Sequence, residues 1–381
     1  MVGFAGCHIA PGARAQALDT LASGWLTAGP RTEAFERALA TWIGARYAIA
    51  VSSCTAAIEL SLRALGLPAG APVLTPTLTF CGAVSAIVHS GLKPVFVDAD
   101  EATMTVNPQA VANAARAKPA AMVLQHMAGY PVAVHELADA AGLPLDRILE
   151  DAAHGLGGAL GDQAIGTISP TTCFSFYATK NLPIGEGGAI TTADAQLADR
   201  LRAMRQHGMS RDAWRRYNPG ADWRYQVEED GLKANFTDLQ AAIGLGQLAH
   251  LTRWQARRAA LADRFDEQLA GTAGIVLPPR PTVGRHAWHL YVIRVLPEYG
   301  RTRDQLVAEL AGRGVGTSVH FIPVHRFGHF RRLLGDQESR LPVAERMADQ
   351  LLSLPLHPQL ADSDVDYVAE QIRDLCRTGR E

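Results

Sequence analysis

Lys180 stands between an apolar run and a glycine-rich turn, in the segment TCFSFYATKNLPIGEGG. Partial burial at such a turn would lower the pKa of its amine and make that amine nucleophilic toward an aldehyde. Taken alone, a solvated surface lysine is the commoner arrangement. The segment therefore marks Lys180 as a candidate nucleophile that needs support from other residues.

A second candidate is Asp151, which ends the run DRILED and precedes AAHG. A carboxylate at the carboxyl end of a parallel strand lies where open α/β sheets bind ligands. An acid there can hold a pyridine nitrogen protonated, which makes the ring an electron sink. The alternative interpretation is that Asp151 only caps the helix that follows.

Small hydroxyl residues open a helical pattern in SSCTAAIELSLRAL, residues 52–65. The free N–H groups and the dipole of a helix start can bind a phosphate, although Ser53 or Thr55 could equally serve only as an N-cap. An aromatic residue, Phe80, follows the next apolar run. A phosphate cradle, an aromatic, an acid and a lysine come in the order that a pyridoxal-phosphate site of the aspartate-aminotransferase fold requires.

The elements that would position these residues alternate between short β-branched runs and helical patterns over residues 45–193. This alternation is typical of an α/β layer with a mostly parallel sheet. Apolar residues spaced three and four apart predict helices at 56–66, 85–91 and 134–142. The seven expected strands are 47–53, 71–76, 93–100, 121–126, 146–151, 172–178 and 187–193.

The length of 381 residues exceeds that of a usual single core, so a large and a small domain are expected. We expect residues 1–250 to form the large, cofactor-binding domain, with residues 1–15 free to pack on the small one. Residues 251–381 would form a linking helix and a smaller α+β domain, with a Gly- and Pro-rich break at 272–284.

Further elements are expected on both sides of that break. In the large domain, residues 195–215 resemble a helix, a polar loop follows over 215–231, and another helix begins near Thr237. The linking helix runs from Leu251 to about Thr272. In the small domain we expect a strand at 287–295, a helix at 303–314, a strand at 315–321 and two terminal helices.

Composition excludes several classes of protein. A formal charge of −2 leaves no broad basic field for nucleic acid, and no stretch approaches the roughly 18 apolar residues of a membrane span. Five cysteines without a Cys-x-x-Cys pair suggest neither a disulfide framework nor a metal site. The first residues lack a targeting pattern. We therefore expect a cytoplasmic enzyme with small-molecule partners.

The chain resembles the DegT/StrS-type (ArnB-like) nucleotide-sugar aminotransferases, which are fold type I pyridoxal-phosphate enzymes, over nearly its whole length. This resemblance implies an aspartate-aminotransferase-like α/β fold, with a seven-stranded mostly parallel sheet and a smaller α+β C-terminal domain. The stretches that carry it are SGWLTAGPRTEAFE (23–36), AIAVSSCTAAIEL (48–60), EDAAHGLGG (150–158), FSFYATKNLPIGEGGAI (174–190), LRAMRQHG (201–208), GLKANFTDLQAAIGLGQL (231–248), HAWHLYVIRV (286–295) and GVGTSVHFIPVH (314–325).

The resemblance implies pyridoxal 5'-phosphate as the cofactor and assigns residues to its ring. Lys180 would form the Schiff base and act as the catalytic residue, and Asp151 would pair with the pyridinium nitrogen. Phe80 would stack on the ring, and His154 would lie beside it near its hydroxyl group. Relatives that dehydrate sugars replace the lysine by histidine, so Lys180 favours amino transfer.

The resemblance also places the phosphate of the cofactor. Cys54, Thr55 and Ser175 would bind it, with the contact of Cys54 made through its backbone. Asn235, in KANFTD, matches a residue that reaches the phosphate of the neighbouring subunit. An active homodimer with shared sites is therefore implied.

For the substrate, the resemblance points to Trp25, Thr27, His320 and His325, the two histidines lying in a segment that closes over cofactor and sugar. Packing is the alternative for Trp25. The neighbouring histidines of the HAWHLY segment, of which His289 is one, are expected to be hydrogen-bonded packing residues rather than catalysts.

The implied reaction is a ping-pong transfer of an amino group, with L-glutamate as donor and a nucleotide-linked keto-deoxysugar as acceptor. The segments HAWHLY and HFIPVH favour a 4-keto over a 3-keto sugar. A cyclitol ketone is the alternative acceptor. Two other interpretations are a catalytically idle cofactor-binding regulatory protein, against which the intact Lys180, Asp151 and Asn235 argue, and a dehydrating or deoxygenating enzyme.

Overall fold

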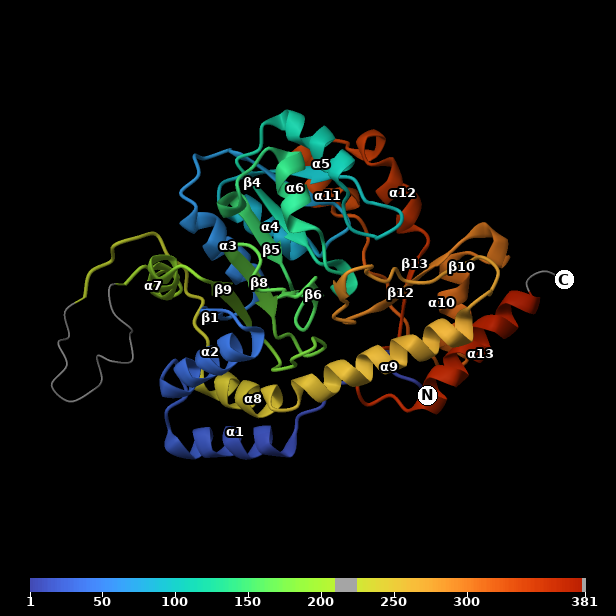
Figure 1. Cartoon of the computed structure of the whole chain (residues 1–381), viewed down its shortest axis with the longest axis horizontal. Helices are drawn as coiled ribbons and strands as arrows, with labels where there is room; N and C mark the ends of the chain where they lie inside the picture. Colours follow the sequence, from blue (N-terminus) through green and yellow to red (C-terminus); the bar gives the residue numbers. More distant parts are fainter. Residues whose placement is uncertain (210–224, 379–381) are drawn as a thin grey trace.

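The computed structural model describes residues 1–209 and 225–378, and Figure 1 shows two α/β parts connected by one long helix, α9 (Leu251–Leu269). The larger part contains a seven-stranded sheet, and the smaller part contains a three-stranded sheet. Among the described helices, none combines the length and the apolar character needed to cross a membrane.

The seven-stranded sheet has the order β1-β9-β8-β5-β4-β2-β3. Within this sheet, adjacent strands from β8 to β3 pair in parallel, whereas β9 is antiparallel to both β1 and β8. Each of the seven runs predicted as strands of the large domain forms one, so the mostly parallel seven-stranded sheet is confirmed. The strands are β1 Tyr47–Val51, β2 Pro72–Pro76, β3 Lys93–Val97, β4 Ala121–Gln125, β5 Ile148–Asp151, β8 Thr171–Ser175 and β9 Gly188–Thr192.

Helices cover both faces of this sheet because its strands are apolar on both faces. Side chains alternate between faces along a strand, so Val123 of β4 packs in one core while Leu124 packs in the other. Helices α3, α4 and α7 contribute to the first core, and α5 and α6 contribute to the second. The helices of this part are α1 Pro11–Ser23, α2 Pro30–Ile43, α3 Cys54–Ala64, α4 Cys81–His89, α5 Pro108–Ala114, α6 Val134–Ala141, α7 Ala195–Met204 and α8 Asp238–Leu248.

The predicted helices of the large part are present, with shifted bounds. The patterns at 56–66, 85–91 and 134–142 form α3, α4 and α6. The helix near Thr237 is α8, and Thr237 is its N-cap in a reciprocal capping box with Gln240. The helix predicted over 195–215 is seen as α7, which ends at Met204. Residues 210–224, where the end of that prediction and most of the polar loop fall, lie outside the described residues.

The smaller sheet consists of β10 (Ile275–Val276), β12 (Tyr291–Val295) and β13 (Leu351–Leu354), all antiparallel. The strand predicted at 315–321 is wrong. That segment forms only single bridges, from Val315 to Val2 and from Ser318 to Ser353. The run 351–354, which was not predicted, pairs with β12 along its whole length and excludes 315–321 from that position.

The two parts interleave at several points. The N-terminal Val2 packs in the core of the small part and is hydrogen-bonded to Gly314 and Gly316. In the other direction, helix α12 returns to the large sheet, where the carboxylate of Asp98 accepts hydrogen bonds from the first N–H groups of the helix. Three described helices follow residue 321, where two were predicted. From residue 251 onward the helices are α9, α10 Arg303–Gly312, α11 Gly328–Leu334, α12 Pro342–Ala348 and α13 Asp362–Thr378.

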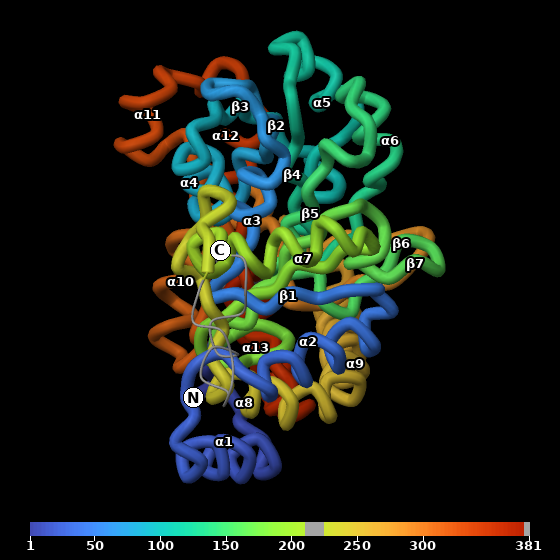
Figure 2. The backbone as a smooth tube through the Cα atoms, turned by 90° about the vertical axis from the view of Figure 1, so that its left-hand side faces the viewer, coloured from blue at the N-terminus to red at the C-terminus, as the bar shows by residue number. Residues whose placement is uncertain are grey.

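Short elements complete the connections. Figure 2 shows β6 and β7 projecting from one side of the large part, where they pair with β11. These strands are β6 Ala159–Leu160, β7 Gln163–Ala164 and β11 Gly284–Arg285. The 3₁₀ turns are η1 Ala115–Ala117, η2 Met127–Gly129, η3 Leu145–Arg147, η5 Pro297–Tyr299, η6 Val324–Arg326 and η7 Glu338–Arg340.

A buried ionic group fixes the end of β5 behind the sheet edge. Glu150 accepts hydrogen bonds from His126 Nε2 at 2.8 Å, from Ser169 Oγ at 2.7 Å and from Thr172 Oγ1 at 2.9 Å. His126 Nδ1 accepts the N–H of Val132, so its hydrogen lies on Nε2, toward the carboxylate. Burial opposes ionisation, but these donors outweigh it and hold the pKa of Glu150 below its ordinary value.

We predict that Glu150→Ala lowers the free energy of unfolding by about 3–5 kcal/mol, because it leaves the partners of a buried carboxylate without an acceptor. Since the pKa of Glu150 is lowered in the folded chain, its contribution is complete above the ordinary Glu range and is lost as the pH falls. Urea denaturation at pH 7 and in acid measures both effects. Glu338→Ala, which removes an exposed partner of Arg331, should change stability little. Equal losses for the two variants would contradict the prediction.

Candidate active site

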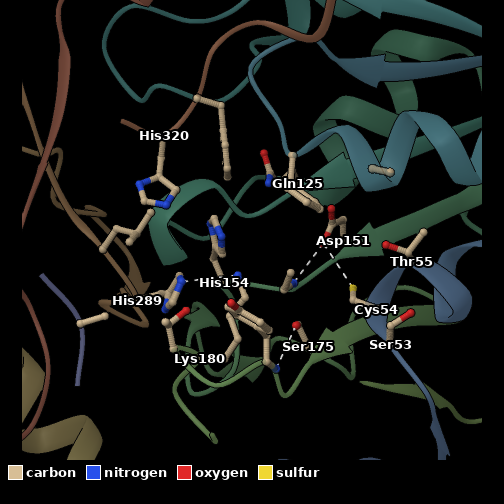
Figure 3. Close-up of a pocket in the computed structure, with 18 of the residues that line it drawn as sticks. Ser53, Cys54, Thr55, Gln125, Asp151, His154, Ser175, Lys180, His289 and His320 are labelled. Carbon is tan, nitrogen blue, oxygen red and sulfur yellow. Dashed lines mark hydrogen bonds between the residues drawn. The ribbon is translucent and has the colours of Figure 1, made fainter. Parts of the chain in front are cut away.

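A cavity of about 480 Å³ opens at one edge of the large sheet (Figure 3). Strands β4, β5 and β8 run parallel to one another, and β1 has the same direction because β9 is antiparallel to both β1 and β8. Their carboxyl ends therefore meet at one edge, and the residues that follow them form the floor of the cavity. Residues 4–6, 289–290, 320–321, 354 and 356–357 close it from the small part and the N-terminus.

One end of the cavity is formed by the start of α3. Ser53 is the N-cap and accepts the N–H of Ala56 at 3.1 Å. The N–H groups of Cys54 and Thr55, in the first turn, have no carbonyl acceptor within the helix. Gly188 of β9 lies against this turn, and a Cβ there would come within 2.5 Å of the Ser53 backbone. The junction is thus a capped helix start whose remaining N–H groups could bind an anion.

Asp151 ends β5 and is buried in the floor of the cavity. Its Oδ1 accepts the N–H of Ala153 at 3.0 Å and lies 3.7 Å from Cys54 Sγ. Burial raises the pKa of Asp151, despite the opposing effects of the Ala153 hydrogen bond and the charge of Lys180. A buried carboxylate in this state is stabilised by any cation that enters the cavity. The thiol of Cys54 thus lies beside Asp151, and the expected contact of the Cys54 backbone with a phosphate stays a prediction.

Lys180 lies in the loop after β8, where its N–H donates to Tyr177 O at 2.8 Å. Its amine points into the cavity, 3.4 Å from Nε2 of His289. Burial lowers the pKa of Lys180 to about 8, although Asp151 and Cys54 act in the opposite direction. The amine is thus far more readily deprotonated than an ordinary lysine, which makes it a competent nucleophile and base.

Imidazoles surround the amine from the other side. His154 and His289 lie with ring centroids 4.4 Å apart, and His154 Nδ1 accepts the N–H of Ala128. His320 Nδ1 lies 2.9 Å from Ser353 Oγ. Burial and the charge of Lys180 lower the pKa of each ring, that of His320 to about 4. The three rings are therefore neutral near pH 7.

Three further residues complete the walls. Phe80, singled out by the order of the motifs, and Ser175, implied by the resemblance, both line the cavity, with Phe80 at its mouth, 59 % exposed and 6.4 Å from the Phe321 ring. Gln125 also lines it, and its buried Oε1 has no hydrogen-bond partner among the described residues. Gln125 ends β4, so the rule that identified Asp151, a polar residue at the carboxyl end of a parallel strand, could have identified it too.

Three predicted substrate residues lie outside the cavity of their own chain. His325 is buried beside it, with Nδ1 2.6 Å from Thr77 Oγ1 and Nε2 2.6 Å from Glu345 Oε1. Trp25 donates its indole N–H to the carbonyl of Ala28. Thr27 accepts a hydrogen bond from Asp238 N through its carbonyl. Of the four residues predicted to bind substrate, only His320 lines the cavity with Lys180 and Asp151.

Asn235 lies near the start of α3 but outside the cavity. It forms a bridge with Val51, and its Oδ1 accepts from Lys233 Nζ at 2.8 Å. Its side chain is partly exposed rather than engaged with the helix that begins at Asp238. Asn235 is not the cap of that helix, because Thr237 caps α8.

Comparison with known proteins places the chain in one aminotransferase family. A sequence profile of the DegT/DnrJ/EryC1/StrS aminotransferase family matches residues 9–373. The spore coat polysaccharide biosynthesis protein SpsC of Bacillus subtilis (strain 168) is 43 % identical over 364 residues, covering 94 % of this chain and 93 % of SpsC.

Solved structures agree with this match. Spr1654 from Streptococcus pneumoniae, solved in PMP, PLP and apo forms, is 28 % identical with a TM-score of 0.90, and in the PMP form each chain covers 100 % of the other. The sugar aminotransferase CalS13 from Micromonospora echinospora is 27 % identical with a TM-score of 0.86, covering 98 % of this chain and 100 % of CalS13.

We predict that acylation of Lys180 in the cofactor-free chain rises as the pH passes about 8, because only the neutral amine reacts. Short pulses of a small acylating reagent across a pH series, followed by peptide mass mapping, measure this rate. The exposed Lys93 in the same digest reports how the reagent itself varies with pH.

Asp151→Asn gives the matched variant for this experiment. It removes the negative charge that favours the ammonium form, so the rise in Lys180 acylation should move to lower pH. A Lys180 rate that still climbs above about pH 10, as for an ordinary lysine, would contradict the assignment.

Proposed function

Because the chain belongs to the DegT/DnrJ/EryC1/StrS aminotransferase family, we propose that it transfers an amino group from L-glutamate to a nucleotide-linked keto-deoxysugar, with a 4-keto sugar favoured. The family and the solved neighbours establish that the chain is a pyridoxal-phosphate-dependent sugar aminotransferase, as the sequence resemblance predicted. The observation that carries the proposal is the partly buried amine of Lys180, which shares one cavity with the buried carboxylate of Asp151.

The residues of the cavity fit pyridoxal phosphate. A helix start with free N–H groups suits the phosphate, and a buried carboxylate of raised pKa suits a protonated ring nitrogen. The unpartnered Oε1 of Gln125 shows that the cavity holds a polar atom still to be satisfied. When bound, the cofactor supplies an aldehyde that takes up the amino group and a ring that accepts electrons.

Each cavity residue then has a definite task. Cys54 and Thr55 bind the phosphate through the N–H groups of the first turn of α3, and Ser175 binds it from the end of β8. Asp151 keeps the ring nitrogen protonated. Phe80 and His154 flank the ring and exclude water from it.

Lys180 has two tasks in this proposal. Its amine would hold the cofactor between turnovers, and the same amine, once free, would act as the base and acid that moves a proton between the donor α-carbon and C4′. A pKa of about 8 suits both tasks, because the free base is accessible near neutral pH and the ammonium can still return the proton.

Support for a sugar acceptor comes from two sources. SpsC acts in polysaccharide biosynthesis by its name, and CalS13 is a sugar aminotransferase. The segments that favour a 4-keto sugar, HAWHLY and HFIPVH, both reach the cavity, through His289 and through His320. His320 is therefore proposed as the substrate contact from this chain, and His325 supports its segment through Thr77 and Glu345.

The working unit in this proposal is a homodimer. Trp25 and Thr27 lie outside the cavity of their own chain, so a substrate role for them requires a second copy. Asn235 is proposed to complete the phosphate site of that second copy. Its partly exposed side chain, next to the start of α3, is compatible with this role.

We expect the purified, cofactor-loaded enzyme to convert L-glutamate to 2-oxoglutarate in the presence of a nucleotide-linked 4-keto-6-deoxysugar. Mass spectrometry of the aminated sugar nucleotide, across a panel of 4-keto and 3-keto sugars and a cyclitol ketone, measures the preference. Lys180→Ala is the matched control, since it should abolish turnover while the phosphate and Asp151 contacts still bind cofactor.

The possible outcomes separate the alternatives. Amination of the cyclitol alone would replace the nucleotide-sugar proposal. Cofactor binding with no turnover on any acceptor would favour a regulatory protein. Loss of the sugar hydroxyl without a new amine would favour a dehydrating enzyme.

We predict that mixing inactive Lys180→Ala and Asn235→Ala chains restores activity. If Asn235 acts across the interface, one site of a mixed dimer carries both defects and the other site carries neither. If it acts within its own chain, each site carries one defect and no activity returns. Native mass spectrometry confirms subunit exchange, and a wild-type rate for Asn235→Ala alone would remove Asn235 from the site.

A further inference from the structure

A continuous chain of hydrogen bonds runs from helix α9 to the catalytic amine. Gln255 of α9 contacts Asn181, Asn181 contacts Nδ1 of His289 at 3.2 Å, and Nε2 of His289 contacts Lys180 Nζ at 3.4 Å. His289 and Asn181 are buried. The sequence favoured a hydrogen-bonded packing residue at His289, and the structure adds that one of its hydrogen-bond partners is the amine of Lys180.

The orientation of the Asn181 side chain follows from its neighbours. Its Nδ2 lies 2.8 Å from the carbonyl oxygen of Ala287 and 3.2 Å from that of Leu156, and carbonyl oxygens only accept hydrogen bonds. Gln255 Nε2 donates to the same two carbonyls, which turns its Oε1 toward Asn181 Nδ2 as a third acceptor. The remaining atom of the amide, Oδ1, therefore faces His289.

This orientation fixes the tautomer of His289. Because Asn181 Oδ1 can only accept, Nδ1 of His289 must carry the hydrogen. The ring is neutral, since burial and the charge of Lys180 lower the pKa of His289. Nε2 therefore presents a lone pair to the amine of Lys180.

The main chain at His289 is fixed by the same helix. Arg258, three residues after Gln255 on α9, is buried and donates through Nη1 to the carbonyl oxygens of Trp288, His289 and Leu356. Its charge also acts against protonation of His289. One face of α9 thus positions both the backbone and the ring that meet Lys180.

We propose that His289 is a positioning residue that, held in the Nδ1–H tautomer by Asn181, accepts a hydrogen bond from the free amine of Lys180 and directs its lone pair toward the reacting carbon. The proposal deepens the proposed function and rests on it for the identity of the reaction. When the amine of Lys180 is protonated, Nε2 of His289 also accepts a hydrogen bond from this ammonium group and stabilises it. The other titratable groups that face Lys180 are Asp151, Cys54, His154 and His320.

The first test reads the tautomer directly in the full chain. We expect ¹⁵N-histidine NMR spectra at neutral pH, with and without pyridoxal phosphate, to show His289 neutral with its hydrogen on Nδ1. His289→Phe identifies the signal by its loss. Asn181→Ala should release the tautomer and allow hydrogen on Nε2. A wild-type signal from an Nε2–H tautomer or from an imidazolium would overturn the proposal.

The second test reads the effect on Lys180. His289→Phe keeps the ring volume but removes the acceptor, so the acylation pH profile of Lys180 should move to lower pH. His286→Phe is the matched control, because His286 packs on Trp288 in the same segment and accepts the Trp288 N–H. It should lower stability and leave the Lys180 profile unchanged. Equal profiles for both variants would overturn the proposal.

Turnover gives the third readout. His289→Phe should lower kcat about tenfold, the effect of losing one charge-assisted hydrogen bond, with a much smaller change in KM. His289→Gln, which can place an amide oxygen near the position of Nε2, should recover part of that rate. No recovery in His289→Gln, together with a wild-type acylation profile of Lys180 in His289→Phe, would count against the proposal. The tautomer and the acylation profile need no substrate, so their failure would leave the proposed function intact.

Discussion

The removal of one lysine amine from water is the constraint on which this structure depends. A lysine loses solvation when it is buried, and Asp151, Cys54 and the acceptor His289 Nε2 act against this loss at Lys180. The parallel strands bring Asp151 to the amine from the large part, and the small part brings His289. Neither part alone encloses the cavity, so the chemistry requires both.

Helix α9 holds these two parts in register. Its first residue, Leu251, packs in a core of the large part, while Leu261 and Phe265 pack in the core of the small part. Between these anchors, Gln255 and Arg258 fix the carbonyl groups of residues 287–289. A shift of the small part would therefore change the environment of Lys180. This coupling explains why a polar network is buried at a place where apolar residues would pack more simply.

The strands of the large sheet could be predicted because each is a short apolar run that ends at a turn, and burial on both faces makes that signal local. The small part was harder to predict. Residues 315–321 have the composition of a strand, yet β13 occupies the edge of β12, and Val315 pairs with the N-terminal Val2 instead. A choice between two segments for one sheet edge depends on packing between distant parts of the chain, which a local pattern does not contain.

For the site, the sequence by itself identified the proposed reacting groups: the helix start at Cys54 follows β1, Asp151 ends β5 and Lys180 follows β8, and these strands share one direction, so their carboxyl ends lie at one edge. Only the tertiary structure decided which histidines join them. His289 and His325 both lie in segments that carry the sequence resemblance to the family. The first faces the amine of Lys180, whereas the second is hydrogen-bonded to Thr77 and Glu345 outside the cavity. The physical reason is that a side chain's partner depends on how two separately built cores close on each other, and that closure is set by α9 and its buried hydrogen bonds rather than by any local run of residues.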